Sequence, residues 1–125
     1  MMNLRRINTV TFNGVYGISK DGKIYNVPEN YASKSKLLEG DILNIYLNDQ
    51  GEYIFKQIER VPRKMEVGIV DSGIKRMIIF IPRLNRKFKV LKASESYFHL
   101  QPGMRVAVTI RSDENCGFCA IENLL

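Results

Sequence analysis

An internal repeat is the feature that most limits how this chain can fold. When the 125-residue sequence is aligned with itself at an offset of 63 positions, eight identical pairs join residues 18–59 to residues 81–122 without a gap. Average residue usage would give about one identity in seventeen positions, which is several times fewer. The identical pairs are Ile18 and Ile81, Val27 and Val90, Ser33 and Ser96, Leu37 and Leu100, Gly40 and Gly103, Phe55 and Phe118, Ile58 and Ile121, and Glu59 and Glu122. Both halves are therefore expected to build the same unit.

The expected boundary between the two copies is Val61-Pro62-Arg63-Lys64, because a proline interrupts strand pairing. This boundary gives a first repeat of residues 1–61 and a second of residues 62–125. A unit of about 60 residues is close to the lower limit for independent stability, so we expect the two copies to share an apolar interface.

Each copy is rich in β-forming residues that occur in short runs. Asn13-Gly14 is a hairpin turn signal, because both residues tolerate a positive φ, and Tyr31–Leu38 lacks period-2 alternation and predicts a short helix or helical turn. The expected strands are Arg6–Phe12, Val15–Ser19, Lys23–Val27, Asp41–Leu47 and Glu52–Arg60 in the first copy, and Lys87–Leu91, Arg105–Arg111 and Cys116–Asn123 as strands three to five of the second.

Three strands, a helical connection and a hairpin follow the strand order of an OB barrel. The sequence therefore predicts an all-β chain of tandem duplicated five-stranded OB-like small barrels, each with a short helical turn between strands three and four. The same order fits SH3-like barrels and a single cradle-type barrel assembled from both copies. Chain length does not decide between one fused barrel and two.

Two stretches carry a resemblance to known families. Asp21–Val27 followed by Leu37–Ile45, with its Gly40-Asp41 turn, resembles the third-strand, helix and fourth-strand segment of bacterial initiation-factor OB domains, although Met104 follows Gly103 in the second copy. Tyr31–Asp41, with Phe55–Ile58 and Val61–Lys64, resembles small two-repeat proteins of reduced-genome bacteria. That family is sometimes labelled ribosomal-stalk-related, which implies a ribosomal setting.

Several classes of protein are disfavoured by composition. The chain is 45% hydrophobic, which is too apolar for a disordered tail. Its most apolar run, Met77–Ile81, ends at Pro82 and is too short to span a membrane. The first six residues carry two arginines but no long apolar segment or cleavage site, so we expect a cytoplasmic protein without a membrane partner.

Catalytic and metal-binding motifs are scarce. Cys116 and Cys119 have the spacing of metal ligands, but His99 is the one further soft candidate, which leaves a structural zinc site one ligand short. Phosphate-cradling loops, nucleophile elbows and paired-carboxylate motifs are missing from the sequence. We expect two reduced cysteines, no cofactor, no metal and no enzymatic activity.

The basic residues are unevenly distributed. Residues 1–61 hold 8 basic and 7 acidic residues, whereas residues 62–125 hold 11 and 6, so that most of the net charge of +6 lies in the second copy. Between Lys75 and Lys92 the sequence has seven basic residues and no acidic one. Such a cluster indicates either a solvated surface or a polyanionic partner.

Nucleic-acid binding accounts best for this charge, because OB-like barrels hold a polyanion with lysine and arginine while bases stack on exposed aromatic rings. Core packing is the alternative role of Tyr25 and Phe88, which share a strand face with Val27 and Val90. We expect a non-catalytic RNA-binding protein whose partners are ribosomal RNA and ribosomal proteins, with a protein-interaction or structural module as the alternative. The candidate RNA-binding residues are Lys20, Lys23, Tyr25, Lys34, Lys36, Arg60, Arg63, Lys64, Lys75, Arg76, Arg83, Arg86, Lys87, Phe88, Lys89 and Lys92.

Overall fold

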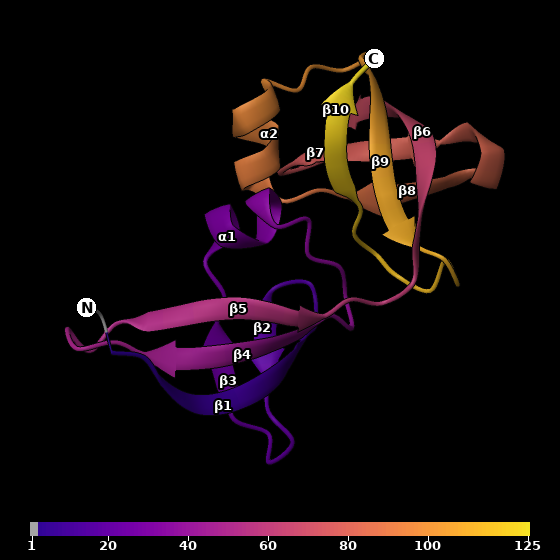
Figure 1. The fold of residues 1–125 in the computed structure, drawn as a ribbon. Coiled ribbons are helices and arrows are strands. Elements are labelled where there is room, and N and C mark those ends of the chain that lie inside the picture. Colours follow the sequence, from indigo (N-terminus) through magenta and orange to yellow (C-terminus); the bar gives the residue numbers. More distant parts are fainter. Residues whose placement is uncertain (1–2) are drawn as a thin grey trace.

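Ten strands divide into two antiparallel sheets, one from each half of the chain. A computed structural model describes residues 3–125. The first sheet has the order β3-β2-β1-β4-β5 and contains β1 (Arg5–Phe12), β2 (Tyr16–Ile18), β3 (Ile24–Asn26), β4 (Ile42–Leu47) and β5 (Tyr53–Glu59). The second sheet has the order β10-β9-β6-β7-β8 and contains β6 (Arg63–Ser72), β7 (Met77–Ile81), β8 (Arg86–Lys89), β9 (Arg105–Arg111) and β10 (Ala120–Leu124). The chain is thus mostly β and forms two sheets rather than one fused sheet (Figure 1).

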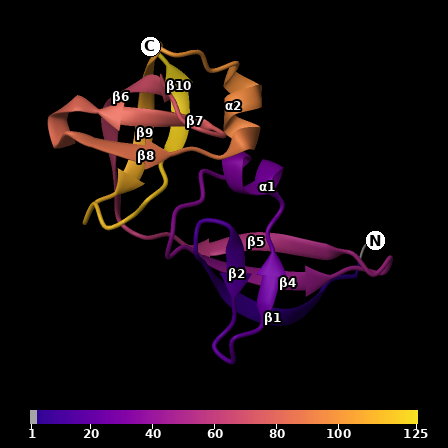
Figure 2. The same ribbon diagram turned by 180° about the vertical axis from the view of Figure 1, so that it is seen from behind.

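A short helix joins the third and fourth strands of each sheet. Helix α1 spans Glu29–Lys34 and α2 spans Lys92–Phe98, and a 3-10 turn, η1, covers Pro82–Leu84. The helix expected at Tyr31–Leu38 begins and ends earlier, because Lys36 takes a left-handed φ of 53° and the chain then turns Leu37 and Leu38 into the interior. Figures 1 and 2 show α1 next to the end of α2 where the two copies meet, with α2 flanking the second sheet.

The backbone repeats with the period found in the sequence. Among residues 3–125, four pairs with positive φ are each separated by 63 positions: Gly22 and Asn85, Lys36 and His99, Gly40 and Gly103, and Gly51 and Glu114. Residues other than glycine and asparagine rarely adopt this conformation. Their recurrence therefore shows that the two copies share turn geometry as well as strand order.

The copies differ in their first and last strands. Val10 pairs with Leu43, whereas Gly68 pairs with Val106, so the first strands are offset by 58 positions and the β6–β7 hairpin is longer. Ile45 pairs with Phe55, whereas Val108 pairs with Ile121, so the fifth strands are offset by 66 positions. The strand expected at Cys116–Asn123 consequently begins only at Ala120.

This shift brings the segment before β10 against β8 in the second copy. Lys89 and Phe118 form an isolated parallel bridge, in which the Lys89 amide donates to the Gly117 carbonyl at 2.7 Å and the Cys119 amide donates to the Lys89 carbonyl at 2.9 Å. The first copy has side-chain contact between β3 and β5 instead, where the Tyr25 and Tyr53 rings pack edge to face with centroids 5.7 Å apart.

Each copy has its own apolar core. The first contains Val10, Phe12, Tyr25, Val27, Ala32, Leu37, Leu43 and Ile45. The second contains Val70, Ile79, Ile81, Phe88, Val90, Leu100, Val106, Val108, Ile110, Cys116, Cys119 and Ile121. Strand alternation explains the pattern, because inward residues of β4 and β9 recur every second position. Within residues 3–125, no helix is long and apolar enough to cross a membrane.

Candidate nucleic-acid interface

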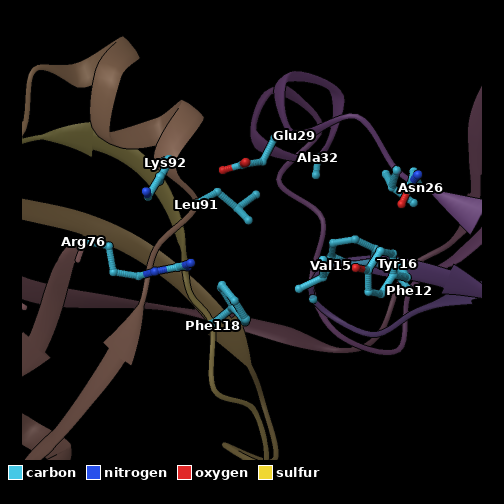
Figure 3. Close-up of a pocket in the computed structure, with 12 residues that line it drawn as sticks. Phe12, Val15, Tyr16, Asn26, Glu29, Ala32, Arg76, Leu91, Lys92 and Phe118 are labelled. Atoms are coloured by element: carbon cyan, nitrogen blue, oxygen red, sulfur yellow. The ribbon is translucent and has the colours of Figure 1, made fainter. Parts of the chain in front are cut away.

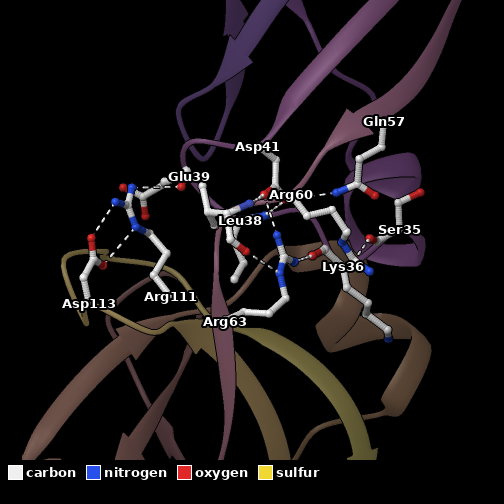
Figure 4. A network of polar contacts seen from close by, with 11 residues as sticks. Ser35, Lys36, Leu38, Glu39, Asp41, Gln57, Arg60, Arg63, Arg111 and Asp113 are labelled. Carbon is white, nitrogen blue, oxygen red and sulfur yellow. Dashed lines mark hydrogen bonds and ion pairs between the residues drawn. The ribbon is translucent and has the colours of Figure 1, made fainter.

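The junction between the copies is organised around a buried carboxylate. Asp41 is fully buried and accepts hydrogen bonds from the amides of Leu38 and Val61, both at 2.8 Å, and from the Gln57 side chain at 3.0 Å. The guanidinium of Arg63 forms an ion pair with the same carboxylate (Figure 4). Because Arg63 opens β6, this pair ties the second copy to the first.

Further polar contacts cross the junction. Arg111 Nη1 donates to the Glu39 carbonyl at 3.0 Å, and the Glu39 carboxylate accepts from the amides of Gly117 and Phe118 at 2.9 and 3.1 Å. The helices are joined by the Ser33 and Ser94 hydroxyls, whose oxygens are 2.6 Å apart. The expected interface is apolar only in part, since Leu91 packs against the first core and Gly14 lies against the Phe118 ring. These contacts fix the orientation of the two copies.

A cleft of about 320 Å³ lies between the copies beside these contacts. Figure 3 shows residues of the two copies facing each other across it. The first copy contributes the β1–β2 turn around Val15 and Tyr16, and the second contributes Leu91, Lys92 and Phe118 together with Arg76 from the β6–β7 hairpin. The lining combines apolar side chains, such as Phe12 and Leu91, with the polar or charged side chains of Asn26, Glu29, Arg76 and Lys92.

Two of the expected cations, Arg76 and Lys92, line this cleft, and a third, Lys89, lies beside its Phe118 ring. The Arg76 guanidinium carbon lies 5.9 Å from the centre of the Phe118 ring, and Lys89 Nζ lies 5.7 Å from it. Lys92, at the start of α2, lines the cleft from the same copy. Between residues 3 and 125, none of the three forms an ion pair with a carboxylate. Their positive charge therefore remains available to an anionic ligand.

Phe118 was missed as a candidate because the gapless alignment equates it with Phe55. Phe55 packs against the first core, whereas the shifted fifth strand leaves Phe118 half-buried at the cleft. The sequence signal that could have found it is Gly117, which permits an irregular segment before the strand.

The expected roles of Tyr25 and Phe88 in base stacking are wrong. Tyr25 is 5% exposed and Phe88 is 1% exposed, and both rings belong to the cores. Lys23 Nζ lies 5.3 Å from the Tyr25 ring centre, and the Arg86 guanidinium carbon lies 4.3 Å from that of Phe88. Since both pairs are related by 63 positions, the repeated basic-aromatic pattern is a cation–π contact within each copy.

Four other candidate cations are held by acidic partners. Arg63 pairs with Asp41, and Lys64 pairs with Glu114. Arg83 Nε donates to both carboxylate oxygens of Glu66, at 2.9 and 3.1 Å, and this hydrogen bonding lowers the pKa of Glu66 and raises that of Arg83. Lys87 Nζ lies 3.7 Å from Asp71, and both of these side chains are at least half exposed. These pairings could not be predicted from the sequence, because the acidic partners lie outside the basic segment between Lys75 and Lys92.

Carbonyl oxygens engage three more candidates. Lys36 Nζ donates to the Ile121 carbonyl at 2.6 Å, across the junction. Arg86 donates to the carbonyls of Glu114 and Cys116 at 2.6 and 2.5 Å, and Arg60 lies 3.5 Å from that of Ser35. Lys20, Lys34 and Lys75 are exposed and do not line the cleft.

The two cysteines belong to the second core. Burial raises the pKa of both thiols, so they are held as neutral groups. Residues 3–125 contain no group of three or more potential metal-ligating side chains. His99 has a left-handed φ of 51° at the end of α2.

Comparison of the chain with protein-family models and with curated proteins gives no match.

Proposed function

We propose that this chain is a non-catalytic RNA-binding protein of the cytoplasm, built from two OB-like barrels and acting at the ribosome. The strand order β3-β2-β1-β4-β5, repeated in the second sheet, agrees with OB connectivity, in which the first strand lies between the second and the fourth. The short helix between strands three and four and the parallel Lys89–Phe118 bridge support the same interpretation.

The observation that carries the proposal is that Arg76 and Lys92 line the cleft while Arg76 and Lys89 lie close to the Phe118 ring at its wall. Phosphate contacts from lysine and arginine supply most of the affinity of non-specific RNA binding. Cations already paired with carboxylates would have to exchange one anion for another, so their contribution would be smaller. The unpaired cluster at the cleft is therefore the expected centre of the RNA-binding surface.

The expected selectivity is for RNA shape rather than for sequence. Cations contact phosphates more readily than base edges, and phosphate contacts carry no direct sequence information. Structured RNA is recognised largely by shape. Ribosomal RNA satisfies this requirement, and the two copies, fixed relative to each other by Asp41 and Arg63, present a rigid surface to it.

The test is a gel-shift or filter-binding titration over a range of salt concentrations. Changing Arg76, Lys89 and Lys92 together to glutamine should weaken binding at low salt by at least about tenfold, and should lower the slope of log K against log salt by about one for each phosphate that the variant no longer neutralises. Lys56→Gln is the matched control, because Lys56 is exposed on β5 of the first sheet, where it lies over Tyr46. Circular dichroism verifies folding.

Ribosome association is measured by sedimenting purified ribosomes with the protein at low and high salt. Co-sedimentation that disappears at high salt, and that disappears in the triple variant at low salt, supports the proposal. Absence of salt-sensitive RNA binding by the natural protein would refute it.

The alternative, a protein-interaction module, has one specific observation in its favour. The outer face of β6 exposes Met65, Val67 and Ile69. Pairing with β4 and β9 places Arg6, Thr9 and Thr11 at the equivalent positions of the first copy. The fold therefore does not require apolar residues on this face. Partner binding that persists at high salt and is abolished by Val67→Thr with Ile69→Thr would favour this alternative.

A further inference from the structure

The cleft between the copies has the properties of a preformed ligand site. Its walls belong to different copies, and they are held in place by the Asp41–Arg63 ion pair and the Ser33–Ser94 contact. Pockets for small ligands commonly measure about 300 to 1,000 Å³. At about 320 Å³, this cleft has room for one small ligand and not for a stacked strand.

The wall from the second copy combines positive charge with an apolar surface. Arg76 and Lys92 lie at its rim, and Leu91 and Phe118 form its apolar part (Figure 3). The one acidic side chain of the described lining, Glu29, comes from the first copy. Its carboxylate accepts a hydrogen bond from the Ala93 amide of the second copy at 3.2 Å. This arrangement suits a ligand with an anionic end and a flat apolar body.

The wall from the first copy offers polar groups that could face the flat part of such a ligand. Tyr16 is 40% exposed, and the Asn26 side chain is also exposed, so a phenol and an amide face the space between the copies. Because β2 and β3 pair Tyr16 directly with Asn26, the two side chains lie on the same face of the sheet. An amide has both donors and an acceptor, which is what the edge of a nucleobase requires.

We propose that the cleft binds one nucleoside monophosphate unit, with its phosphate between Arg76 and Lys92 and its base between the apolar wall and Tyr16. Such a unit is supplied by a free nucleotide or by an unstacked nucleotide of an RNA strand. This inference rests on the proposed RNA-binding function, which it refines. A base inside a duplex cannot enter the cleft, so within a structured RNA the protein prefers bulges, loops and other single-stranded segments to duplex segments.

The experiment is an amide NMR titration of the full chain with four probes. They are AMP, inorganic phosphate, a single-stranded RNA octamer, and the same octamer in a duplex. With AMP, the amides of residues 14–16 and 91–93 should shift, and inorganic phosphate should perturb them less because it lacks a base. The single strand should bind at least about tenfold more tightly than the duplex, since a base must leave its stack in the duplex before it can enter the cleft.

The Tyr16→Ala variant should lose most of this preference for the single strand while it retains salt-sensitive RNA binding. Tyr97→Ala is its control, because Tyr97 is 76% exposed on α2 and does not line the cleft. Equal affinity for the single strand and the duplex, without cleft shifts, would overturn the nucleotide site and leave RNA binding intact. Shifts with AMP but no binding of either RNA would retain the site and refute the RNA-binding function.

Discussion

Replacing Asp41 with methionine is the substitution that most directly tests how the copies are joined. Met104 occupies the equivalent position of the second copy, 63 residues later, so methionine is compatible with the local fold. In the first copy, however, the change would remove the one carboxylate that faces Arg63, Gln57 and two backbone amides. We expect a large loss of stability.

The magnitude follows from the groups that would lose their acceptor. The amides of Leu38 and Val61 are fixed by the backbone, and each buried unsatisfied donor costs about 1–3 kcal/mol. The Gln57 side chain can turn towards solvent, and the Arg63 side chain is 16% exposed, so part of its charge can be hydrated. Removing one partner of a buried ion pair costs about 3–5 kcal/mol. A decrease of about 3–5 kcal/mol in the free energy of unfolding is therefore expected.

Urea denaturation followed by far-ultraviolet circular dichroism measures this decrease. A double-mutant cycle with Arg63→Met separates the ion pair from the amide contacts, and a coupling energy of at least about 1 kcal/mol is expected for residues in direct contact. Arg83→Met is the control, since that arginine pairs with Glu66 at a distance from the junction. A decrease below about 1 kcal/mol in Asp41→Met would refute the reasoning, because it would mean that the buried carboxylate contributes nothing beyond packing.

Two further predictions concern the repeated glycines and the acid stability of the second copy. Gly40 and Gly103 have φ values of 99° and 94°. A Cβ atom on Gly40 would lie 2.8 Å from Val61 Cγ1. Apart from the two neighbouring residues in the chain, nothing among residues 3–125 would lie within 4 Å of a Cβ atom on Gly103. In urea titrations, Gly103→Ala should cost about 1–2 kcal/mol through backbone strain alone, and Gly40→Ala at least about 1 kcal/mol more through crowding; equal losses would contradict this account. Arg83 lowers the pKa of Glu66 below its ordinary value of 4.5, so Glu66 stabilises the folded state above that pH, and this stabilisation is lost as the pH falls through the lowered pKa. The urea midpoint of Glu66→Gln should therefore depend less on pH below about 4.5 than that of the natural protein, and parallel pH profiles would show that the interaction does not contribute.

Much of the secondary structure could be predicted from local sequence signals. The runs around β4 and β9 alternate in polarity, and Asn13-Gly14 marks a turn that opens with a φ of 104° at Gly14. The helix prediction was approximately right, but its end depended on Lys36, whose left-handed conformation has no local sequence signature. Turns and strands that depend on a few neighbouring residues could therefore be predicted, whereas helix ends that depend on tertiary packing could not.

The candidate site was predicted less well, because the alternation rule does not say which face of a strand is buried. Lys23 with Tyr25 and Arg86 with Phe88 suggested exposed stacking surfaces, yet both rings turned inwards and the cations covered them. Arg83 and Lys64 pair instead with Glu66 and Glu114, which lie 17 and 50 residues away from them in the chain. Such partners meet only in the folded protein.

The sequence by itself determined the duplication. A turn glycine (Gly40 and Gly103) and a set of apolar residues recur at a separation of 63 positions, and similar local preferences produce the same turns and the same strand order in both copies. The tertiary structure decided everything that depends on how the copies meet. The pairing of β10 is shifted by three positions relative to that of β5, so Phe118 lies at the cleft and not at the core position of Phe55. The Asp41–Arg63 pair holds the two walls of the cleft in place. Register and long-range pairing depend on contacts between distant segments, so they are set only when both copies have packed together.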